Sequence, residues 1–374
     1  KNHKVYSWMT DESIQTITNG YLLPNETLKD AFTRVAVSVA SKLNKTEMAN
    51  LFLEAMEKNW LCLASPVLSN SGTERGLPIS CNSIHIADSV SNIFKKNTEL
   101  AMLTKGGAGV GIYVGDVRGR GSKIAGNGVG EGVIPWIKCL EQTTLSVSQG
   151  STRRGSAACY LPIEHSDYEE FIQIRRATGD INKRARTMNI GACITDKFMN
   201  DMLEGNEHNR KLWQETLKER VENGEPYMFF TDNVNKANPE CYKDKDLKVV
   251  TSNICNEIYL YTDAEHTFVC CLSSLNLARY DEWRNYTFSN GMTLPELSTW
   301  FLDGVLEEYI QKAGNKEGFE CSVRSAVKGR ALGLGVLGFH SYIQNKLLDL
   351  ESFEAGLINA EIFKFIKEEA EKAS

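Results

Sequence analysis

The chain has 374 residues, of which 42% are hydrophobic and 24% are charged, and its formal net charge is −6. This is the composition of a globular protein with a sizeable core, and it excludes the disordered and fibrous classes. The acidic balance argues against a protein whose main work is to grip nucleic-acid backbones, although it is compatible with a local nucleotide pocket.

Targeting signals and cysteine spacing narrow the class further. The sequence contains no run of about 18 apolar residues, so we expect no transmembrane helix. Its first segment lacks the apolar stretch of a signal peptide, and we therefore expect a cytoplasmic protein. The ten cysteines are scattered, without a C-x-x-C pair or zinc-like spacing, so we expect neither a disulfide framework nor a bound metal.

Residues 1–60 are predicted to form a helical N-terminal region. The run 28–43 has apolar residues at helical spacing, and a further helix is expected from Thr46. After Trp60 short apolar runs alternate with turns rich in glycine, serine and asparagine, so residues 61–374 are expected to form a second domain.

Strands and helices are predicted to alternate along this second domain. The predicted strands lie at 109–117, 158–163, 189–194, 225–233, 249–261 and 267–280. The predicted helices lie at 133–147, 166–176, 195–224, 294–313 and 352–374, and residues 326–346 combine glycines with a helical pattern. The glycine-rich stretch 104–132 permits tight turns but contains no P-loop motif.

The most informative segment is Asn253-Ile254-Cys255-Asn256-Glu257. In an extended strand alternate side chains share a face, so Asn253, Cys255 and Glu257 are expected to line up on one side. An amide, a thiol and a carboxylate together offer hydrogen bonding, a nucleophile or radical carrier, and a base. Taken alone, the pattern also fits a half-buried strand with a polar face.

The flanking segments favour the catalytic interpretation. The sequences LASPVLSNSG (63–72) and ISCN (79–82) precede this motif, and VCCLSSLNL (269–277) follows it. In this order they resemble the large subunit of aerobic ribonucleotide reductases, as does QGSTRRG at 149–155. The resemblance implies a ten-stranded α/β barrel of two five-stranded parallel halves, of which this chain covers the first half and the start of the second.

The resemblance also implies a function and roles for the central motif. The chain would be the catalytic subunit that reduces ribonucleotides to deoxyribonucleotides by thiyl-radical chemistry. Cys255 matches the cysteine that becomes the radical and takes the 3′-hydrogen of the ribose. Glu257 matches the base for the 3′-hydroxyl, and Asn253 matches the amide that binds near the 2′-hydroxyl.

Further positions match the reducing pair and the substrate contacts. Cys81 and Cys270 match the two cysteines that supply electrons, with Cys271 in the place of a neighbour. Because adjacent strand residues face opposite sides, only one of Cys270 and Cys271 can point at Cys81, and the alignment favours Cys270. Ser65 and Ser80 match substrate-binding positions, although each also fits ordinary turn chemistry.

Two loops resemble the family's effector site, which binds a nucleoside triphosphate. Asp88 and Ser89 match effector-binding positions, and Arg118 matches an arginine that binds the triphosphate. Residues 178–189 look like the second specificity loop, and the alternative for them is a solvated basic loop. The side chains of this loop suited to phosphate and base contacts are Lys183, Arg184 and Arg186.

The chain also departs from the family pattern. Too few residues precede position 63 for the family's N-terminal ATP-binding domain, and its phosphate loop, tyrosine pair and cysteine tail are not found after residue 280. We therefore expect a complementary C-terminal fragment as a partner. The other expected partners are a metal-containing, radical-generating small subunit, thioredoxin or glutaredoxin, and a second large subunit in a homodimer.

No cofactor is expected in this chain besides the nucleoside triphosphate effector, and neither nucleic acid nor membrane is expected as a partner. Three alternatives stay open. The first is a reductase that uses adenosylcobalamin, the second is another radical enzyme with the same barrel, and the third is a nucleotide-binding regulator derived from a reductase.

Overall fold

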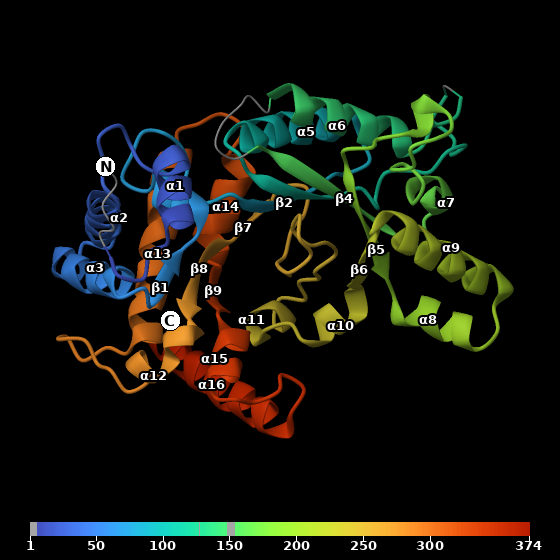
Figure 1. Ribbon diagram of the computed structural model, residues 1–374. Helices are drawn as coiled ribbons and strands as arrows, with labels where there is room; N and C mark the ends of the chain where they lie inside the picture. Colours follow the sequence, from blue (N-terminus) through green and yellow to red (C-terminus); the bar gives the residue numbers. More distant parts are fainter. Residues whose placement is uncertain (1–5, 127, 148–153) are drawn as a thin grey trace. The chain divides into compact units, whose positions relative to one another are not determined.

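The computed structural model describes residues 6–126, 128–147 and 154–374 (Figure 1). Most of the segment 149–155 singled out above, including Arg153, lies outside these residues. The chain divides into two compact units. Unit 1 comprises Lys1–Ile79, Cys270–Asn315 and Gly329–Ser374, and unit 2 comprises Ser80–Val269 and Lys316–Lys328.

Unit 1 begins with the predicted helical region, which contains α1 (Asp11–Gly20), α2 (Leu28–Lys42) and α3 (Ala49–Glu57). Thr27 caps α2 in a capping box with Asp30, which satisfies backbone N–H groups at the start of the helix. The apolar stripe of α2 packs against α13 (Leu294–Ala313), a helix that is mostly buried. The helices predicted at 28–43 and 294–313 are therefore confirmed.

A three-stranded sheet in unit 1 has the order β1-β8-β9. Strand β1 (Leu61–Leu63) is antiparallel to β8 (Cys271–Asn276), and β8 is parallel to β9 (Leu332–Leu337). The sequence pattern did not reveal β9, because glycines interrupt it. Gly333 is required there, since an added Cβ would lie 3.0 Å from the sulfur of Cys270.

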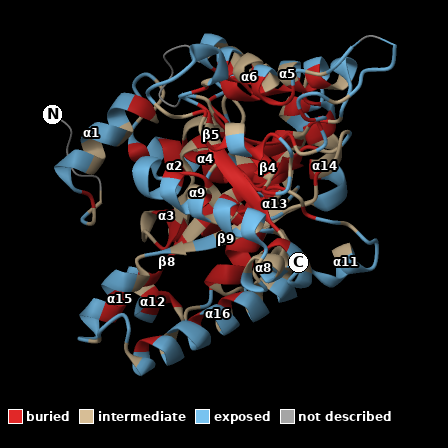
Figure 2. Ribbon diagram, turned by 90° about the vertical axis from the view of Figure 1, so that its right-hand side faces the viewer, coloured by how far each residue is buried: buried red, intermediate tan, exposed pale blue. Residues whose placement is uncertain are grey.

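The remaining helices of unit 1 are shorter or more exposed. Helix α4 (Ser65–Asn70) follows β1, and α12 (Tyr280–Trp283) and α15 (Phe339–Asn345) follow β8 and β9. Helix α16 (Phe353–Ala373) confirms the helix predicted at 352–374 and packs against α13. Much of α15 and α16 is exposed (Figure 2).

Unit 2 contains a six-stranded sheet with the order β6-β5-β4-β3-β2-β7. Its five parallel strands are β2 (Cys81–His85), β3 (Gly109–Tyr113), β4 (Ser156–Pro162), β5 (Asn189–Ile194) and β6 (Tyr227–Phe230). Strand β7 (Phe268–Val269) is antiparallel to β2. The α/β class is thus confirmed, and this sheet has the five parallel strands expected of one half of the barrel.

Helices cover this sheet and connect its strands. Helices α5 (Val90–Lys105) and α6 (Ile134–Val147) pack against each other and against β3 and β4 (Figure 1). The helix predicted at 195–224 is broken at Gly205, where φ is +107°, into α8 (Asp196–Leu203) and α9 (Glu207–Asn223). The helix predicted at 166–176 shortens to α7 (Tyr168–Phe171), and α14 (Glu320–Gly329) lies largely within unit 2.

Candidate functional site

The segment 249–261 is not a strand, and its prediction as one was wrong. Residues 254–256 form a turn, and Asn256 has a left-handed backbone with φ +61°. The oxygen of the Asn253 side chain accepts hydrogen bonds from the backbone N–H groups of Glu257, at 3.1 Å, and Ile258, at 3.0 Å. These N–H groups would otherwise be available to a sheet ladder, so the asparagine side chain competes with strand formation.

This loop lies directly on one face of the unit 2 sheet. A Cβ added at Gly109 would lie 2.6 Å from the side chain of Ile254, and one added at Gly111 would collide with the carbonyl oxygen of Ser252. Ile254 packs against a buried cluster on the sheet that includes Tyr160. The two glycines of β3 are therefore what allows the loop to approach the strands so closely.

The three motif residues do not share one face. Asn253 is buried, whereas Cys255 and Glu257 are exposed. The turn that presents Cys255 is held by Asn256, whose amide donates to the carbonyl of Met228 at 2.9 Å. Burial raises the pKa of the neighbouring Tyr227 phenol, with a smaller contribution from the charges of Glu225 and Cys255.

Cys81 is the first residue of β2, and the loop is linked to it. The side-chain amide of Asn253 donates to the sulfur of Cys81 at 3.2 Å, and both residues are buried. Ser80 precedes this cysteine, and its carbonyl accepts a hydrogen bond from Gly109 at 2.9 Å. The sequence did not predict the Asn253–Cys81 contact, because nothing local relates the two segments.

Cys270 and Cys271 belong to unit 1, and they differ in their surroundings. The thiol of Cys271 is fully buried and donates to the carbonyl of Leu302 in α13 at 3.5 Å. Burial raises the pKa of Cys271 well above its ordinary value. An extended backbone then directs Cys270 to the opposite side. The pairing of Cys270 with Cys81 stays a prediction.

Ser65 lies at the start of α4 in unit 1, where its hydroxyl is 2.9 Å from the hydroxyl of Tyr21. Its role in substrate binding, like that of Ser80, stays a prediction.

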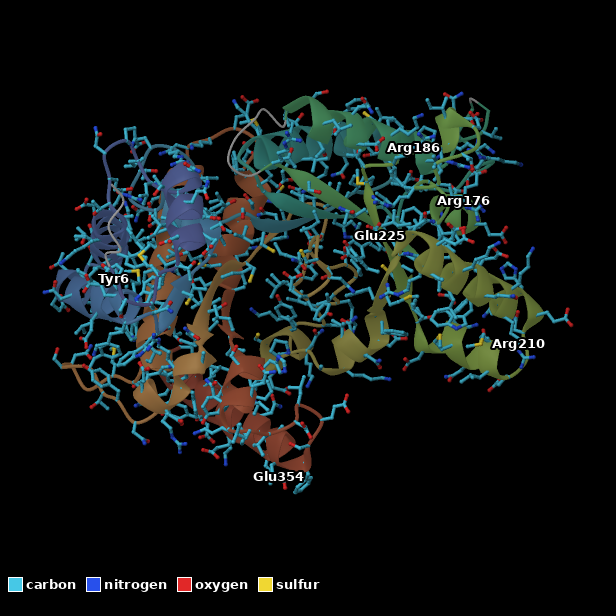
Figure 3. The ribbon with its side chains drawn as sticks, in the orientation of Figure 1. Tyr6, Arg176, Arg186, Arg210, Glu225 and Glu354 are labelled. Atoms are coloured by element: carbon cyan, nitrogen blue, oxygen red, sulfur yellow. The ribbon has the colours of Figure 1, made fainter. Side chains whose placement is uncertain are left out.

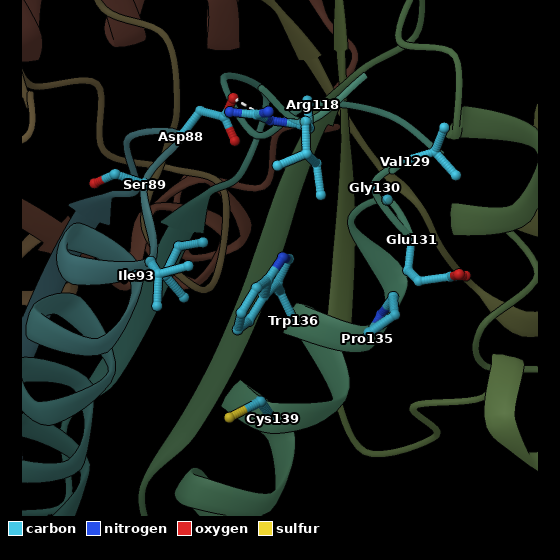
Figure 4. A pocket seen from close by; sticks show the side chains of 13 residues that line it. Asp88, Ser89, Ile93, Arg118, Val129, Gly130, Glu131, Pro135, Trp136 and Cys139 are labelled. Atoms are coloured by element: carbon cyan, nitrogen blue, oxygen red, sulfur yellow. Dashed lines mark hydrogen bonds and ion pairs between the residues drawn. The ribbon is translucent and has the colours of Figure 1, made fainter. Parts of the chain in front are cut away.

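The predicted effector residues Asp88, Ser89 and Arg118 line one pocket of unit 2, with a volume of about 420 Å³ (Figure 4). Arg118 Nε donates to Asp88 Oδ2 at 2.8 Å. Ser89 caps α5, and its hydroxyl oxygen accepts from the backbone N–H of Asn92. The start of a long helix and an arginine are groups that bind anions, and Asp88 and Glu131 place two carboxylates in the same lining.

Part of the pocket lining is apolar and was not predicted. Ile93 of α5 and Trp136 of α6 form it, together with Cys139 (Figure 4). No sequence signal marks these residues, because only the packing of α5 against α6 brings them to one place. The pocket thus combines a charged end with an apolar surface that suits a flat ring.

The second predicted loop does not line this pocket. The side chain of Arg184 donates to the carbonyl of Thr178 at 2.8 Å, and that of Arg186, labelled in Figure 3, donates to the carbonyl of Ala177. The ammonium of Lys183 lies 3.6 Å from Oε1 of Glu170. The three side chains are partly or largely exposed, and their proposed contacts with nucleotide stay predictions.

Two negative observations apply to the described residues alone. Among them, no group of three or more histidine, cysteine, aspartate or glutamate side chains is arranged to hold a metal ion. None of the helices within these ranges is both long enough and apolar enough to cross a membrane.

Two protein-family models match this chain. The family described as "Ribonucleotide reductase, barrel domain" matches residues 79–209 and 205–374. The family described as "Ribonucleotide reductase, all-alpha domain" matches residues 8–76.

Individual relatives are similar over most of this chain. A putative ribonucleoside-diphosphate reductase large subunit of Frog virus 3 (isolate Goorha) is 36% identical over 346 residues, covering 88% of this chain and 59% of its own length. The ribonucleoside-diphosphate reductase large subunit of Invertebrate iridescent virus 3 is 30% identical, and the match covers 87% of this chain and 61% of that protein. The chain thus spans about three fifths of the length of these two relatives.

A solved structure is also similar. The alpha subunit of the Actinobacillus ureae class Id ribonucleotide reductase matches with a TM-score of 0.91 and 36% identity, covering 100% of this chain and 68% of that one.

Proposed function

Because this chain belongs to the family of ribonucleotide reductase large subunits, we propose that it carries the catalytic loop, one reducing cysteine pair and the effector pocket of a ribonucleoside-diphosphate reductase. The observation that carries the proposal is the hydrogen bond between Asn253 and Cys81, at 3.2 Å. It links the loop that bears Cys255 to the strand that bears a reducing cysteine.

The proposed reaction uses one thiyl radical, one carboxylate and one dithiol. The thiyl radical of Cys255 takes the 3′-hydrogen of the ribose, and Glu257 accepts the proton of the 3′-hydroxyl. The 2′-hydroxyl then leaves as water, and the dithiol supplies two electrons and becomes a disulfide. Return of the 3′-hydrogen restores the Cys255 radical, so the balance is one deoxyribonucleotide, one disulfide and one water per ribonucleotide.

Cys81 and Cys270 are the proposed dithiol. Asn82, which follows Cys81, is the register partner of Val269, which precedes Cys270. The buried contact of Cys271 with the carbonyl of Leu302 supports Cys270 over its neighbour. We expect Cys270→Ser to abolish turnover with thioredoxin or glutaredoxin as reductant, and Cys271→Ser to lower stability instead. Full turnover by Cys270→Ser would reverse this choice.

The pocket of Asp88, Ser89 and Arg118 is proposed to bind a nucleoside triphosphate effector. Arg118 and the start of α5 suit the phosphates, and the apolar wall at Trp136 suits the base or sugar. Lys183, Arg184 and Arg186 are proposed to respond to this effector from the loop 178–189.

The proposed source of the radical is a metal-containing small subunit. The similarity to a class Id alpha subunit supports this route over adenosylcobalamin. A second copy of the large subunit is a further proposed partner.

A complementary C-terminal part is also proposed, because the relatives are longer than the region matched here. Within the described residues β9 is at the edge of its sheet, and several apolar side chains near the end of the chain are exposed: Leu347, Leu350, Phe353 and Leu357. An added strand and its helices would cover these groups.

The test reconstitutes the chain with its C-terminal part and small subunit and measures the reduction of a ribonucleoside diphosphate by a dithiol. We expect deoxynucleotide from the wild type and none from Cys255→Ala. Cys241→Ala, which changes an exposed cysteine of unit 2 outside this loop, serves as the matched control. No product from the wild type, or equal product from Cys255→Ala, would contradict the proposal.

A further inference from the structure

The loop between β3 and α6 carries Arg118 into the effector pocket. A buried carboxylate contacts the base of this loop, here called its neck, where the chain departs at residues 117–120 and returns at 132–133. Asp167 Oδ1 accepts the backbone N–H of Arg120, and Oδ2 accepts that of Val133, each at 2.9 Å. Asp167 is only 6% exposed. Asp167 therefore joins the outgoing and returning ends of the loop, beside the Arg120–Glu131 ion pair at 2.8 Å and the backbone hydrogen bond from Gly121 to Gly130.

His165, two residues before Asp167, contacts the backbone of the loop at Val117. His165 Nδ1 accepts the backbone N–H of Asp167 at 3.1 Å, so the proton of the neutral ring lies on Nε2. Nε2 then donates to the carbonyl of Val117 at 2.8 Å. Val117 and Arg120 lie on either side of Arg118 in the chain, so the backbone around this arginine is fixed on both sides.

The glycines of the neck fit this arrangement. Gly132 has φ +81°, and a Cβ added there would collide with the carboxylate of Asp167. A Cβ added at Gly119 would collide with the hydroxyl of Ser166, and it would lie 3.1 Å from Asp167 Oδ1. The glycine-rich sequence of this loop is thus required where the carboxylate enters the neck.

The segment that carries His165 and Asp167 continues into α7, and its Glu170 contacts the loop 178–189. Glu170 Oε2 accepts from the guanidinium of Arg120 at 3.1 Å, and its Oε1 lies 3.6 Å from the ammonium of Lys183. Helix α6, which lines the pocket with Trp136, holds that loop as well, because Glu141 accepts from the backbone N–H of Thr187 at 2.7 Å. The loop 178–189 is therefore connected to the walls of the pocket without lining it.

We propose that the segment 165–170, which includes the first residues of α7, positions the effector pocket. Asp167 fixes the loop that bears Arg118, and Glu170 links that loop to residues 178–189. This inference rests on the proposed assignment of the pocket to a nucleoside triphosphate. It adds that binding in the pocket affects the loop 178–189 through residues 165–170, which need not touch the nucleotide.

The experiment combines two measurements on the full chain. Binding of dTTP, dGTP, dATP and ATP is followed by calorimetry, and amide hydrogen exchange is measured over the loop neck and residues 178–189. The variants are Asp167→Asn and Glu170→Gln. The matched control is Glu296→Gln, since Glu296 is a buried carboxylate of unit 1 that accepts a backbone N–H, from Thr293 at 3.0 Å, and lines no part of the pocket.

We expect Asp167→Asn to weaken nucleotide binding about tenfold and to speed exchange at the amides of Arg120 and Val133 in the absence of nucleotide. Glu170→Gln should bind nucleotide but lose the protection that nucleotide brings to residues 178–189. The control should retain both properties. If Asp167→Asn folds poorly, Gly132→Ala perturbs the same clamp from the loop side and should show the same two effects.

The outcomes separate this proposal from the assignment of the pocket. Unchanged affinity and exchange in Asp167→Asn, with a wild type that binds nucleotide, would overturn the proposal. A wild type that binds none of the four nucleotides would overturn the assigned ligand and the nucleotide part of the proposal together. In that case the exchange rates at Arg120 and Val133 still decide whether Asp167 orders the loop.

Discussion

The side-chain amide of Asn253 donates a hydrogen bond to the sulfur of Cys81 at 3.2 Å, across 172 positions of the chain. Its oxygen at the same time accepts from the backbone N–H groups of Glu257 and Ile258. One buried side chain therefore shapes the turn that presents Cys255 and contacts a proposed reducing cysteine.

Replacing Asn253 by aspartate is expected to make Cys81 less reactive. The carboxylate cannot donate to the sulfur and its charge opposes thiolate formation, so the thiol of Cys81 should be alkylated more slowly. The rate of alkylation of Cys81, measured against pH by mass spectrometry, checks this. Asn290→Asp, in an exposed turn of unit 1, is the control. Equal rates in the Asn253 variant and the wild type would show that the hydrogen bond has no influence on the thiol.

Tyr160 supports, from the sheet, the loop that carries Asn253 and Cys255. Its hydroxyl donates to the carbonyl of Asn253 at 2.6 Å, and both residues are buried. Tyr160→Phe removes this donor, but the carbonyl keeps the hydrogen bond from the backbone N–H of Asn256 at 3.3 Å. We therefore expect a loss of about 1 kcal/mol in the free energy of unfolding. Urea denaturation measures the loss, and alkylation of Cys255 reports any displacement of the turn.

Tyr168→Phe is the matched control for this change. The hydroxyl of Tyr168 pairs with that of Thr216, which also donates to the carbonyl of Leu212. Phenylalanine at position 168 therefore leaves the Thr216 hydroxyl with its partner Leu212. The loss in the free energy of unfolding should be smaller than that at Tyr160. A larger loss at Tyr168 would contradict the assignment of the Tyr160 hydroxyl to the loop.

Lys96 and Glu99 of α5 form a buried ion pair at 2.9 Å, and Lys96 also donates to Thr267, directly before β7. Lys96→Met removes one partner and leaves a buried carboxylate, which should cost about 3–5 kcal/mol. The double variant Lys96→Met/Glu99→Leu should recover most of this loss. Denaturant titrations of the single and double variants decide, and a double variant no more stable than the single one would refute the ion-pair explanation.

Asp263 predicts a dependence of stability on pH. Burial raises its pKa, but hydrogen bonds from Tyr261, His266 and the backbone of Glu265 outweigh this and lower the pKa from 3.8 to about 2. Because the pKa is lower in the folded state, the carboxylate stabilises the fold above pH 4, and this contribution disappears as the pH falls from about 4 to 2. The stability difference between wild type and Asp263→Asn should shrink over that window, and a constant difference would argue against the shift.

Local patterns were sufficient for much of the fold. The apolar spacing of 28–43 and 294–313 predicted α2 and α13, and the short apolar runs at 158–163 and 189–194 predicted β4 and β5. Periodicity depends on neighbours along the chain, so it can be read without knowing what the segment packs against. The identity of Cys255 and Cys81 as candidates followed equally from their sequence contexts.

Other features depend on contacts between distant segments, and they were missed or wrong. The residues at 249–261 have β-forming composition, yet they form a loop because Asn253 takes up local N–H groups and Gly109 and Gly111 admit the backbone onto the sheet. Strand β9 was missed because glycines interrupt its pattern. Gly333 is needed there because neighbouring side chains leave no room for a Cβ.

The proposed effector pocket likewise has some residues that the sequence named and others that only the fold brought there. Asp88 and Arg118 could be named from the sequence, but Trp136 and Asp167 could not, since they meet the pocket and its loop only through helix packing and two backbone hydrogen bonds. Residue types and periodicity thus predicted many of the elements and named the candidate residues. The direction of each side chain and the shape of each loop follow from which distant groups satisfy its hydrogen bonds and fill its space.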